Sequence, residues 1–406
     1  MRIIIDATAA VSGGKLYLEK LISQFAATPS TDQFVVVHGG DLDQLEAALR
    51  SDNIRFHRVD ILSSFRLPAT FTRLFPPGLW RMLWRKFFLP NLLDQLRPDL
   101  LFSNSAFVPP RRDRRFPTVI ALHNSMPLRD ELIAEETSWL LRLRLIWLRR
   151  MIHRSLQNCD TAIVFSHDTR RTIELKFPDI VKPLQVIHHG IDWQGWQGGQ
   201  GDNLDQTATP PSTRPPYLLY VSQFHRYKNV GRLLEAFAMI ADTFPDLQLV
   251  LIGDKADPAY WEEVQSTIQH LKLETRVCYL PACPREELLS LYRDALAFVH
   301  PSLAETCSFP LLEALVLGLP IAAARMSALP EIAADAAIYF DPYQPAEIAE
   351  VLSLIVSNED LRQELSRLAK RRAAAFSWEL SAHQTREVFE QIVANSYQDE
   401  KNEKSG

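Results

Sequence analysis

Two glutamates, Glu305 and Glu313, are the side chains whose type and spacing most suggest chemistry in this chain. The apolar residues 295–299 predict a strand before them. Ser308 and Pro310 predict the N-cap and the first turn of a helix that carries Glu313. A strand, a loop and a helix N-terminus in this order can bind an anion, typically phosphate, through backbone N–H groups and the helix dipole. The stretch therefore predicts an anion site with a carboxylate on each side.

The two carboxylates would repel a phosphate, so we expect their partners to be hydroxyl groups. A ligand that joins a phosphate to a sugar would suit both the anion site and the carboxylates. The alternative is that Glu305 is a solvated loop residue and Glu313 a surface residue of its helix. This stretch alone leaves both interpretations open.

Other candidate residues follow predicted strands elsewhere in the chain. Gly13 and Gly14 follow the first strand and precede a helical pattern, and His123 follows a later strand. Lys228 lies in the loop after the first strand of the second half. Ligands of open parallel sheets bind at the carboxyl ends of strands, and glycine lets a ligand approach the backbone. A tight turn would explain the glycines equally well, and a lone histidine at a strand end is more often structural than catalytic.

Alternating strand and helix patterns position these residues in both halves of the chain. This alternation predicts an α/β fold of parallel sheets with helices on both faces. Residues 194–216 are almost without apolar side chains, which predicts a linker between domains 1–193 and 217–377. The predicted strands are 3–5, 34–38, 54–59, 99–102, 118–122, 161–165, 217–221, 247–252, 277–280 and 295–299.

Length and composition limit the class of protein. A chain of 406 residues fits two domains, and 47% hydrophobic with 23% charged residues is typical of globular proteins. The sequence has no long uncharged apolar run for a membrane span, and it starts on a strand pattern, so we expect no signal peptide. The four scattered cysteines favour neither disulfides nor a zinc site, and no Gly-x-Gly-x-x-Gly dinucleotide fingerprint occurs. We therefore expect a cytoplasmic protein.

The charge is uneven along the chain. Residues 1–200 contain 26 basic and 20 acidic residues, and the rest contain 18 basic and 29 acidic residues. Residues 139–154 form an amphipathic basic pattern, and residues 62–96 mix aromatic with basic side chains. Contact of the first half with an anionic membrane would explain this charge, and a basic outer face on ordinary core helices is the alternative.

The order of the motifs resembles the retaining, nucleotide-sugar-dependent glycosyltransferases of family 4, whose fold is called GT-B. The resemblance covers nearly the whole chain and is strongest from residue 217 to 342. It rests on the paired glutamates Glu305 and Glu313, and on Lys228-Asn229, residues 186–192, Gly318-Leu319-Pro320 and Leu329-Pro330-Glu331.

The resemblance implies two Rossmann-like domains that face each other across a cleft. A helix at about 378–397 would cross back to the first domain, and the polar residues 398–406 are expected to be disordered. The resemblance also implies that Glu313 binds the nucleotide ribose, Glu305 faces the donor sugar, and Lys228 neutralises the diphosphate.

Other roles follow from the same resemblance. Gly13 and Gly14 would let the first domain approach the distal phosphate and the acceptor, and His123 would line the donor sugar. The donor phosphate would bind near the backbone of Thr306, Cys307, Ser308, Phe309 and Leu311. Thr306-Cys307-Ser308 stands where the family often has Gly-Phe-Gly, and Gln223 stands where it tends to have an arginine. We expect Arg226 to replace that arginine.

The implied activity is transfer of a hexosyl group from a nucleotide diphosphate sugar to a glycan, lipid-linked or small-molecule acceptor. The configuration of the anomeric carbon would be retained, without an essential metal or cofactor and without nucleic acid. The protein would act in the cytoplasm, with peripheral contact at the inner face of a membrane. The alternatives are a catalytically silent sugar-nucleotide binder and another GT-B enzyme such as a sugar-nucleotide epimerase.

Overall fold

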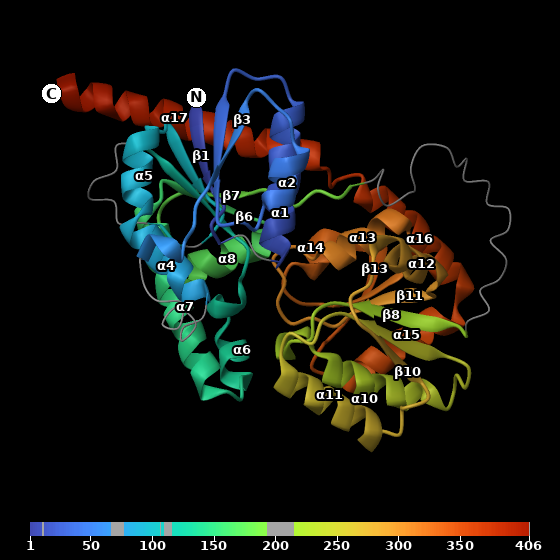
Figure 1. The fold of residues 1–406 in the computed structure, drawn as a ribbon. Helices are drawn as coiled ribbons and strands as arrows, with labels where there is room; N and C mark the ends of the chain where they lie inside the picture. Colours follow the sequence, from blue (N-terminus) through green and yellow to red (C-terminus); the bar gives the residue numbers. More distant parts are fainter. Residues whose placement is uncertain (10–11, 66–76, 106, 109–115, 193–214, 406) are drawn as a thin grey trace. The chain divides into compact units, whose positions relative to one another are not determined.

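The computed structural model describes residues 1–405 except 10–11, 66–76, 106, 109–115 and 193–214 (Figure 1). The chain divides into two compact units. The first unit contains Met1–Ile133, Thr137–His189 and Trp378–Gly406, and the second contains Ala134–Glu136 and Gly190–Ser377. Most of the predicted linker, 194–216, lies outside the described residues. Among the described residues, no helix has the length and apolar content needed to cross a bilayer.

A seven-stranded parallel sheet forms the centre of the first unit, in the order β3-β2-β1-β4-β5-β6-β7. Its central strands are apolar and buried on both faces, as in parallel sheets covered by helices, and Ile4 lies between Val35 and Leu101 of the neighbouring strands. The strands are β1 Arg2–Asp6, β2 Gln33–His38, β3 Ile54–Arg58, β4 Leu100–Ser103, β5 Thr118–Leu122, β6 Thr161–Val164 and β7 Leu184–Val186.

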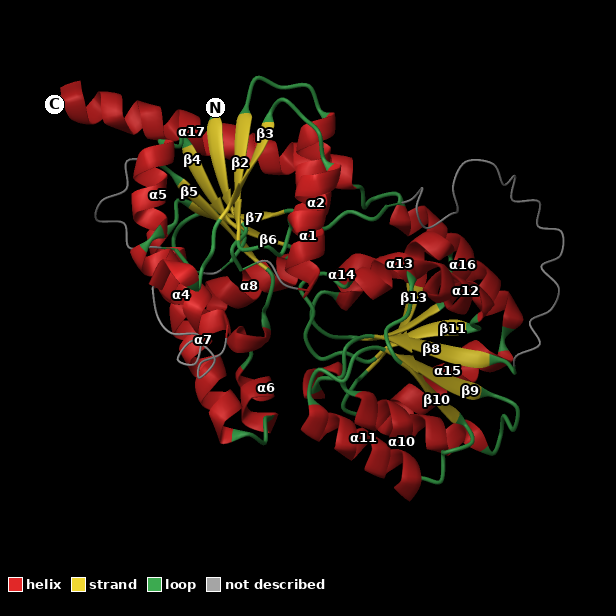
Figure 2. Cartoon of the chain, in the orientation of Figure 1, coloured by secondary structure: helices red, strands yellow, loops and turns green. Residues whose placement is uncertain are grey.

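Helices flank this sheet on both faces (Figure 2). The helical segments of this part of the chain are α1 Ser12–Ala27, α2 Asp43–Ala48, η1 Ser63–Phe65, α4 Pro77–Phe87, α5 Leu89–Leu96, η3 Met126–Leu128, α6 Asp130–Glu135, α7 Trp139–Asn158 and α8 His167–Lys176.

The last helix, α17 (Trp378–Ser405), returns to the first unit, as the resemblance implied. The Phe389 ring packs against Phe25 and Phe102, and Arg386 pairs with Asp32 at 2.8 Å. The helix continues to Ser405, so the expected disorder from 398 onward is replaced by helix. The reason is that Gln, Glu and Lys are good helix formers and no Pro or Gly interrupts the segment before Gly406.

The second unit is built on a six-stranded parallel sheet in the order β10-β9-β8-β11-β12-β13, again between helices (Figure 2). Its strands are β8 Tyr217–Val221, β9 Gln248–Ile252, β10 Val277–Leu280, β11 Ala297–His300, β12 Ile321–Ala324 and β13 Ala337–Phe340. Its helical segments are η4 Arg226–Lys228, α10 Val230–Ala241, α11 Pro258–His270, α12 Arg285–Asp294, α13 Phe309–Leu317, α14 Leu329–Ala333, η5 Ala334–Ala336, α15 Pro345–Ser357 and α16 Glu359–Ala373.

Each sheet has one point at which the strand order reverses. In the first unit the reversal lies between β1 and β4, and in the second between β8 and β11. The loops at the carboxyl ends of these neighbouring strands run in opposite directions, and the space between them is the usual ligand site of such folds. The two predicted α/β domains are therefore confirmed, and each brings residues predicted for a site to its reversal point.

Candidate active site

Lys228 and Glu305 meet at the reversal point of the second unit. Lys228 comes from η4 after β8, and Glu305 comes from the loop after β11. The Lys228 Nζ lies 2.6 Å from Glu305 Oε1, and both side chains are nearly buried. The structure thus joins two residues that lie 77 positions apart in the sequence.

Asn229 holds the Lys228 loop in place. Its backbone is left-handed (φ 62°), a conformation that asparagine tolerates better than most residues. Its buried Nδ2 donates to the carbonyl oxygens of Pro301 (3.2 Å) and Pro342 (2.8 Å). The Leu303 N–H donates to the Tyr227 carbonyl at 2.8 Å, which ties the two loops together directly. The Lys228–Glu305 pair is therefore preorganised by the backbone on both sides.

Glu305 has a second partner, the buried His300 at the end of β11. The His300 Nε2 lies 3.3 Å from Glu305 Oε1 and 2.9 Å from Ser308 Oγ. Burial by itself raises the pKa of Glu305. Lys228 and His300 lower the pKa by more than burial raises it, so that it falls to about 2. Burial lowers the pKa of His300 itself. Glu305 is therefore ionised at neutral pH and fully engaged by its neighbours.

Helix α13 begins at Phe309, shortly after Glu305 in the chain. Ser308 is the N-cap, as predicted, and its Oγ accepts the Leu311 N–H at 3.4 Å, with Pro310 in the first turn. Thr306 and Cys307 are buried in the preceding turn. Because Ser308 already occupies the Leu311 N–H, an anion at this helix end would have to replace that long bond or bind to the dipole beside it.

Glu313 lies in the second turn of α13 and accepts a hydrogen bond of 2.9 Å from the Tyr292 hydroxyl. Burial raises the pKa of Glu313 to about 7, and the Tyr292 hydrogen bond and Arg285 offset only part of that effect. Glu313 therefore changes charge near neutral pH. A carboxylate fixed in this way can accept two hydroxyl donors.

Gly13 and Gly14 lie at the reversal point of the first unit. Helix α1 begins at Ser12, so the glycines belong to its first turn and not to a loop before it. The first N–H groups of a helix have no partner within the helix, which makes glycine less costly here than in a helix interior. A Cβ on Gly14 would lie 3.4 Å from Asn104 Nδ2 and 3.6 Å from His123 Cδ2, both ordinary contacts. The fold itself therefore does not require glycine at position 14.

Asn104 connects Gly14 to His123. Its Nδ2 donates to the Gly14 carbonyl at 3.0 Å, which leaves its Oδ1 to accept from His123 Nε2 at 2.6 Å. Burial lowers the pKa of His123 to about 3. His123 is therefore a neutral imidazole near pH 7 whose orientation Asn104 fixes.

A cavity of about 510 Å³ opens beside these residues within the first unit. One side carries polar groups, among them Gly14, Asn104 and His123. The rest is mainly apolar and is formed by α4 and α7, including Met82, Trp147, Leu148, Met151 and Ile152, with Arg81, Arg85 and Arg144 among them.

Arg226 lies apart from the Lys228 pair. Its guanidinium pairs with Glu263 on α11 at 2.7 Å and stacks over the Tyr260 ring at 5.3 Å. These contacts anchor Arg226 to α11, so the expected replacement of the missing arginine has no support in this geometry.

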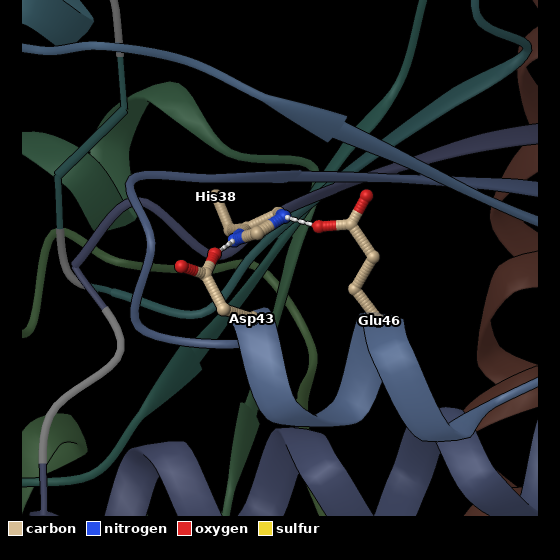
Figure 3. A group of neighbouring side chains, drawn as sticks. All are labelled: His38, Asp43 and Glu46. Carbon is tan, nitrogen blue, oxygen red and sulfur yellow. Dashed lines mark hydrogen bonds and ion pairs between the residues drawn. The ribbon is translucent and has the colours of Figure 1, made fainter.

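A different group, at the carboxyl end of β2, has residue types that could bind a metal (Figure 3). The buried His38 places Nε2 3.1 Å from Glu46 and Nδ1 3.7 Å from Asp43. Its Nδ1 also accepts the Gly40 N–H at 3.3 Å, and Arg58 pairs with Asp43 at 3.1 Å. The neighbouring Gly40 N–H and Arg58 thus already serve this group as a donor and a cation, which fits a structural role.

Sequence reasoning gave no role to Tyr292, His300 or Asn104. His300 and Asn104 stand at the ends of β11 and β4, so the strand-end rule that selected His123 would also have selected them. Tyr292 faces Glu313 from another helix, and no local pattern in the sequence indicates that contact.

Two doubly wound parallel sheets in one chain, each with polar groups at its reversal point, define an α/β protein of the GT-B architecture. Residues 15–194 match the family described as Glycosyltransferase Family 4, and residues 203–372 match the family described as Glycosyl transferases group 1. The chain belongs to glycosyltransferase family 4.

Individual relatives agree with this placement. A D-inositol 3-phosphate glycosyltransferase of Corynebacterium jeikeium is 30% identical over 255 residues, which are 61% of each chain. The match thus spans about three fifths of that curated relative. A sucrose-phosphate synthase from Thermosynechococcus elongatus has the same fold, with a TM-score of 0.74 at 18% identity over 97% of this chain and 100% of that one. Anabaena HepE in complex with UDP-glucose gives a TM-score of 0.68 at 17% identity over 97% and 100%.

Proposed function

We propose that the protein is a retaining glycosyltransferase that transfers a hexosyl group from a nucleotide diphosphate sugar to a glycan, lipid-linked or small-molecule acceptor. The observation that carries this proposal is the buried Lys228–Glu305 pair at the β8/β11 reversal point, next to the N-terminus of α13. A cation, an acceptor carboxylate and a helix dipole at one point suit a ligand with both phosphate and hydroxyl groups. The UDP-glucose in the HepE structure supports a donor of this class.

Each donor group has a proposed partner in the second unit. Glu313, oriented by Tyr292, accepts the ribose hydroxyls. The diphosphate replaces Glu305 as the ion-pair partner of Lys228, and Glu305 then accepts hydrogen bonds from hydroxyls of the donor sugar. The α13 N-terminus, from Thr306 to Leu311, stabilises the distal phosphate. Fixed positive charge is thus in place where negative charge develops on the leaving diphosphate.

The first unit contributes Gly13, Gly14 and His123. We assign the neutral His123 to the transferred sugar, because Asn104 fixes its ring and burial keeps it uncharged. Gly14 leaves room for the acceptor or the distal phosphate, since the fold alone would accept a Cβ there. We further propose that no metal or cofactor is needed, because Lys228 and the helix dipole neutralise the leaving group. The proposed location is the cytoplasm, peripheral to the inner face of a membrane.

A catalytically silent sugar-nucleotide binder is the second candidate. The observation that favours it is the engagement of Arg226 by Glu263, which leaves Gln223 without a substitute arginine beside Lys228. Such a protein would bind donors and release no diphosphate.

The test is a panel of nucleotide sugars with two readouts, thermal stabilisation and acceptor-dependent release of nucleoside diphosphate. A transferase shows both for at least one donor, loses both in Lys228→Met, and keeps the anomeric configuration of the donor in its product, as read by proton NMR. Stabilisation without diphosphate release, over a broad range of acceptors, would establish the silent binder instead. Absence of both would refute the nucleotide-sugar site.

A further inference from the structure

Helix α7 carries a row of large apolar side chains on its solvent side. Trp139, Leu140, Leu143 and Trp147 are 66%, 62%, 55% and 44% exposed. At 100° per residue these positions fall within an arc of roughly 100°. The row therefore forms one continuous apolar face along the first half of the helix.

The fold does not need this face. The opposite side of α7 packs into the core through the buried Leu145, Ile152 and Leu156. An amphipathic helix normally has a polar outer side, whereas the first half of α7 is apolar on its outer side as well. Contiguous exposed apolar surface of this kind indicates a partner.

The charge on α7 indicates which partner. The helix contains five arginines and no acidic residue. Arg144, Arg150 and Arg154 are exposed, and within the described part of the chain none of them pairs with a carboxylate. Arg150 and Arg154 continue the tryptophan face into the second half of the helix. Tryptophan and leucine flanked by unpaired arginines complement an anionic lipid surface, where the apolar groups enter the headgroup boundary and the arginines bind phosphate.

The same helix forms a wall of the cavity beside Gly14 and His123. Trp147 belongs both to the exposed face and to the cavity lining, and Arg144, Leu148 and Met151 continue that lining inward. Helix α4 forms another part of the wall and ends with Phe87, which is 55% exposed. Both helices lie in the same part of the first unit (Figure 1). A lipid bound at the α7 face would therefore lie at the edge of the cavity.

We propose that the exposed face of α7 docks on an anionic bilayer and presents the neighbouring cavity to a lipid-anchored, anionic acceptor. This proposal rests on the proposed transferase activity and narrows its acceptor to amphiphiles held in the membrane. The apolar wall would contact the acyl or polyprenyl part near the headgroup, and Arg144 would face the acceptor phosphate.

Vesicle flotation tests the docking directly, with phosphatidylcholine vesicles that do or do not contain phosphatidylglycerol. We expect the protein to float only with the anionic vesicles and to be released by salt. The variant W139S/L140S/L143S, which leaves the cavity lining intact, should lose flotation. R150S/R154S keeps the apolar face and should lower the partition coefficient about 30-fold, at about 1 kcal/mol per arginine. The control L175S/V181S removes apolar groups elsewhere that are even more exposed, and it should float normally.

The outcomes separate docking from activity. Equal binding to neutral vesicles, normal flotation of W139S/L140S/L143S, or a concentration-dependent dimer that buries the α7 face would each overturn the docking proposal. Diphosphate release with a water-soluble acceptor should survive W139S/L140S/L143S, while release with an acceptor embedded in anionic vesicles should fall at least tenfold. If the variant instead transfers to the embedded acceptor as well as the unchanged protein does, the proposed link between docking and acceptor is wrong. If the unchanged protein releases no diphosphate with any acceptor, the proposed transferase activity is refuted. The flotation result then tests the docking proposal alone.

Discussion

Replacing Glu313 by glutamine should make the free protein more stable at alkaline pH while weakening donor binding. The pKa of Glu313 is raised to about 7 in the folded state by burial, against an ordinary value of 4.5. Between these two pH values the folded protein binds more protons than the unfolded chain, so stability falls as pH rises. Glutamine has no such titration and still accepts the Tyr292 hydroxyl through its amide oxygen.

The size of the effect follows from the pKa difference. At about 1.4 kcal/mol per pKa unit, the full difference corresponds to about 3 kcal/mol. Glu313 keeps some solvent contact, so this is an upper value. For a domain of this size the corresponding change in Tm is up to roughly 6–12 °C. The gain from Glu313→Gln should be complete above the folded pKa and absent below the unfolded pKa.

The assay is thermal unfolding of both proteins from pH 4 to pH 9, with the exposed Glu350→Gln as the matched control. Nucleotide affinity, measured by calorimetry, should fall for the unchanged protein as the pH drops below about 7, because a protonated Glu313 accepts hydroxyls poorly. Glu313→Gln should bind weakly at every pH. Parallel curves of Tm against pH for the unchanged protein and Glu313→Gln would refute the burial argument.

The remaining predictions concern the two reversal points. Lys228→Met should cost about 3–5 kcal/mol, because it leaves the nearly buried Glu305 without its cation and with only His300 beside it, and the double variant K228M/E305L should recover most of this loss in denaturant titrations. Gly14→Ala should keep the Tm within about 1 °C, since a Cβ fits, yet reduce transfer at least tenfold if ligand occupies that space; full activity would show the space to be idle. Arg226→Ala should change kcat/KM less than about threefold, because Glu263 holds its guanidinium, and a loss as large as that of Lys228→Met would restore the replacement hypothesis. Transfer should continue after exhaustive treatment with a chelator, and restoration of a lost rate by added divalent metal would contradict the proposed charge neutralisation.

Local chemistry predicted the parts of this protein that depend on neighbouring residues. The cap at Ser308 and the strands before it follow from short-range rules, and the structure confirms both. The four-residue β13 escaped prediction because it is a short edge strand with little periodicity to read. The sequence places Lys228 and Glu305 only in separate loops. Their contact depends on the reversal of strand order between β8 and β11, which no local pattern encodes.

The sequence also does not predict which carboxylate each basic side chain pairs with. Arg226 and Lys228 are two residues apart, yet one pairs with Glu263 and the other with Glu305. The short turn of η4 sets this divergence, and distance along the chain says nothing about it. The same limit applies to α7. Its basic pattern can be read from the sequence, but its tryptophans can be recognised as exposed only once the buried side of the helix is known.

In the proposed donor site, the Lys228–Glu305 pair would act as an internal competitor for the diphosphate. A nucleotide that binds would displace the Glu305 carboxylate from the ammonium group, and the carboxylate would return when the nucleotide leaves, so that neither event leaves the Lys228 cation unpaired. This exchange would lower the affinity for the donor and for the spent nucleotide alike. Under the proposed activity, weaker binding of the product would make turnover resist inhibition by accumulating nucleoside diphosphate.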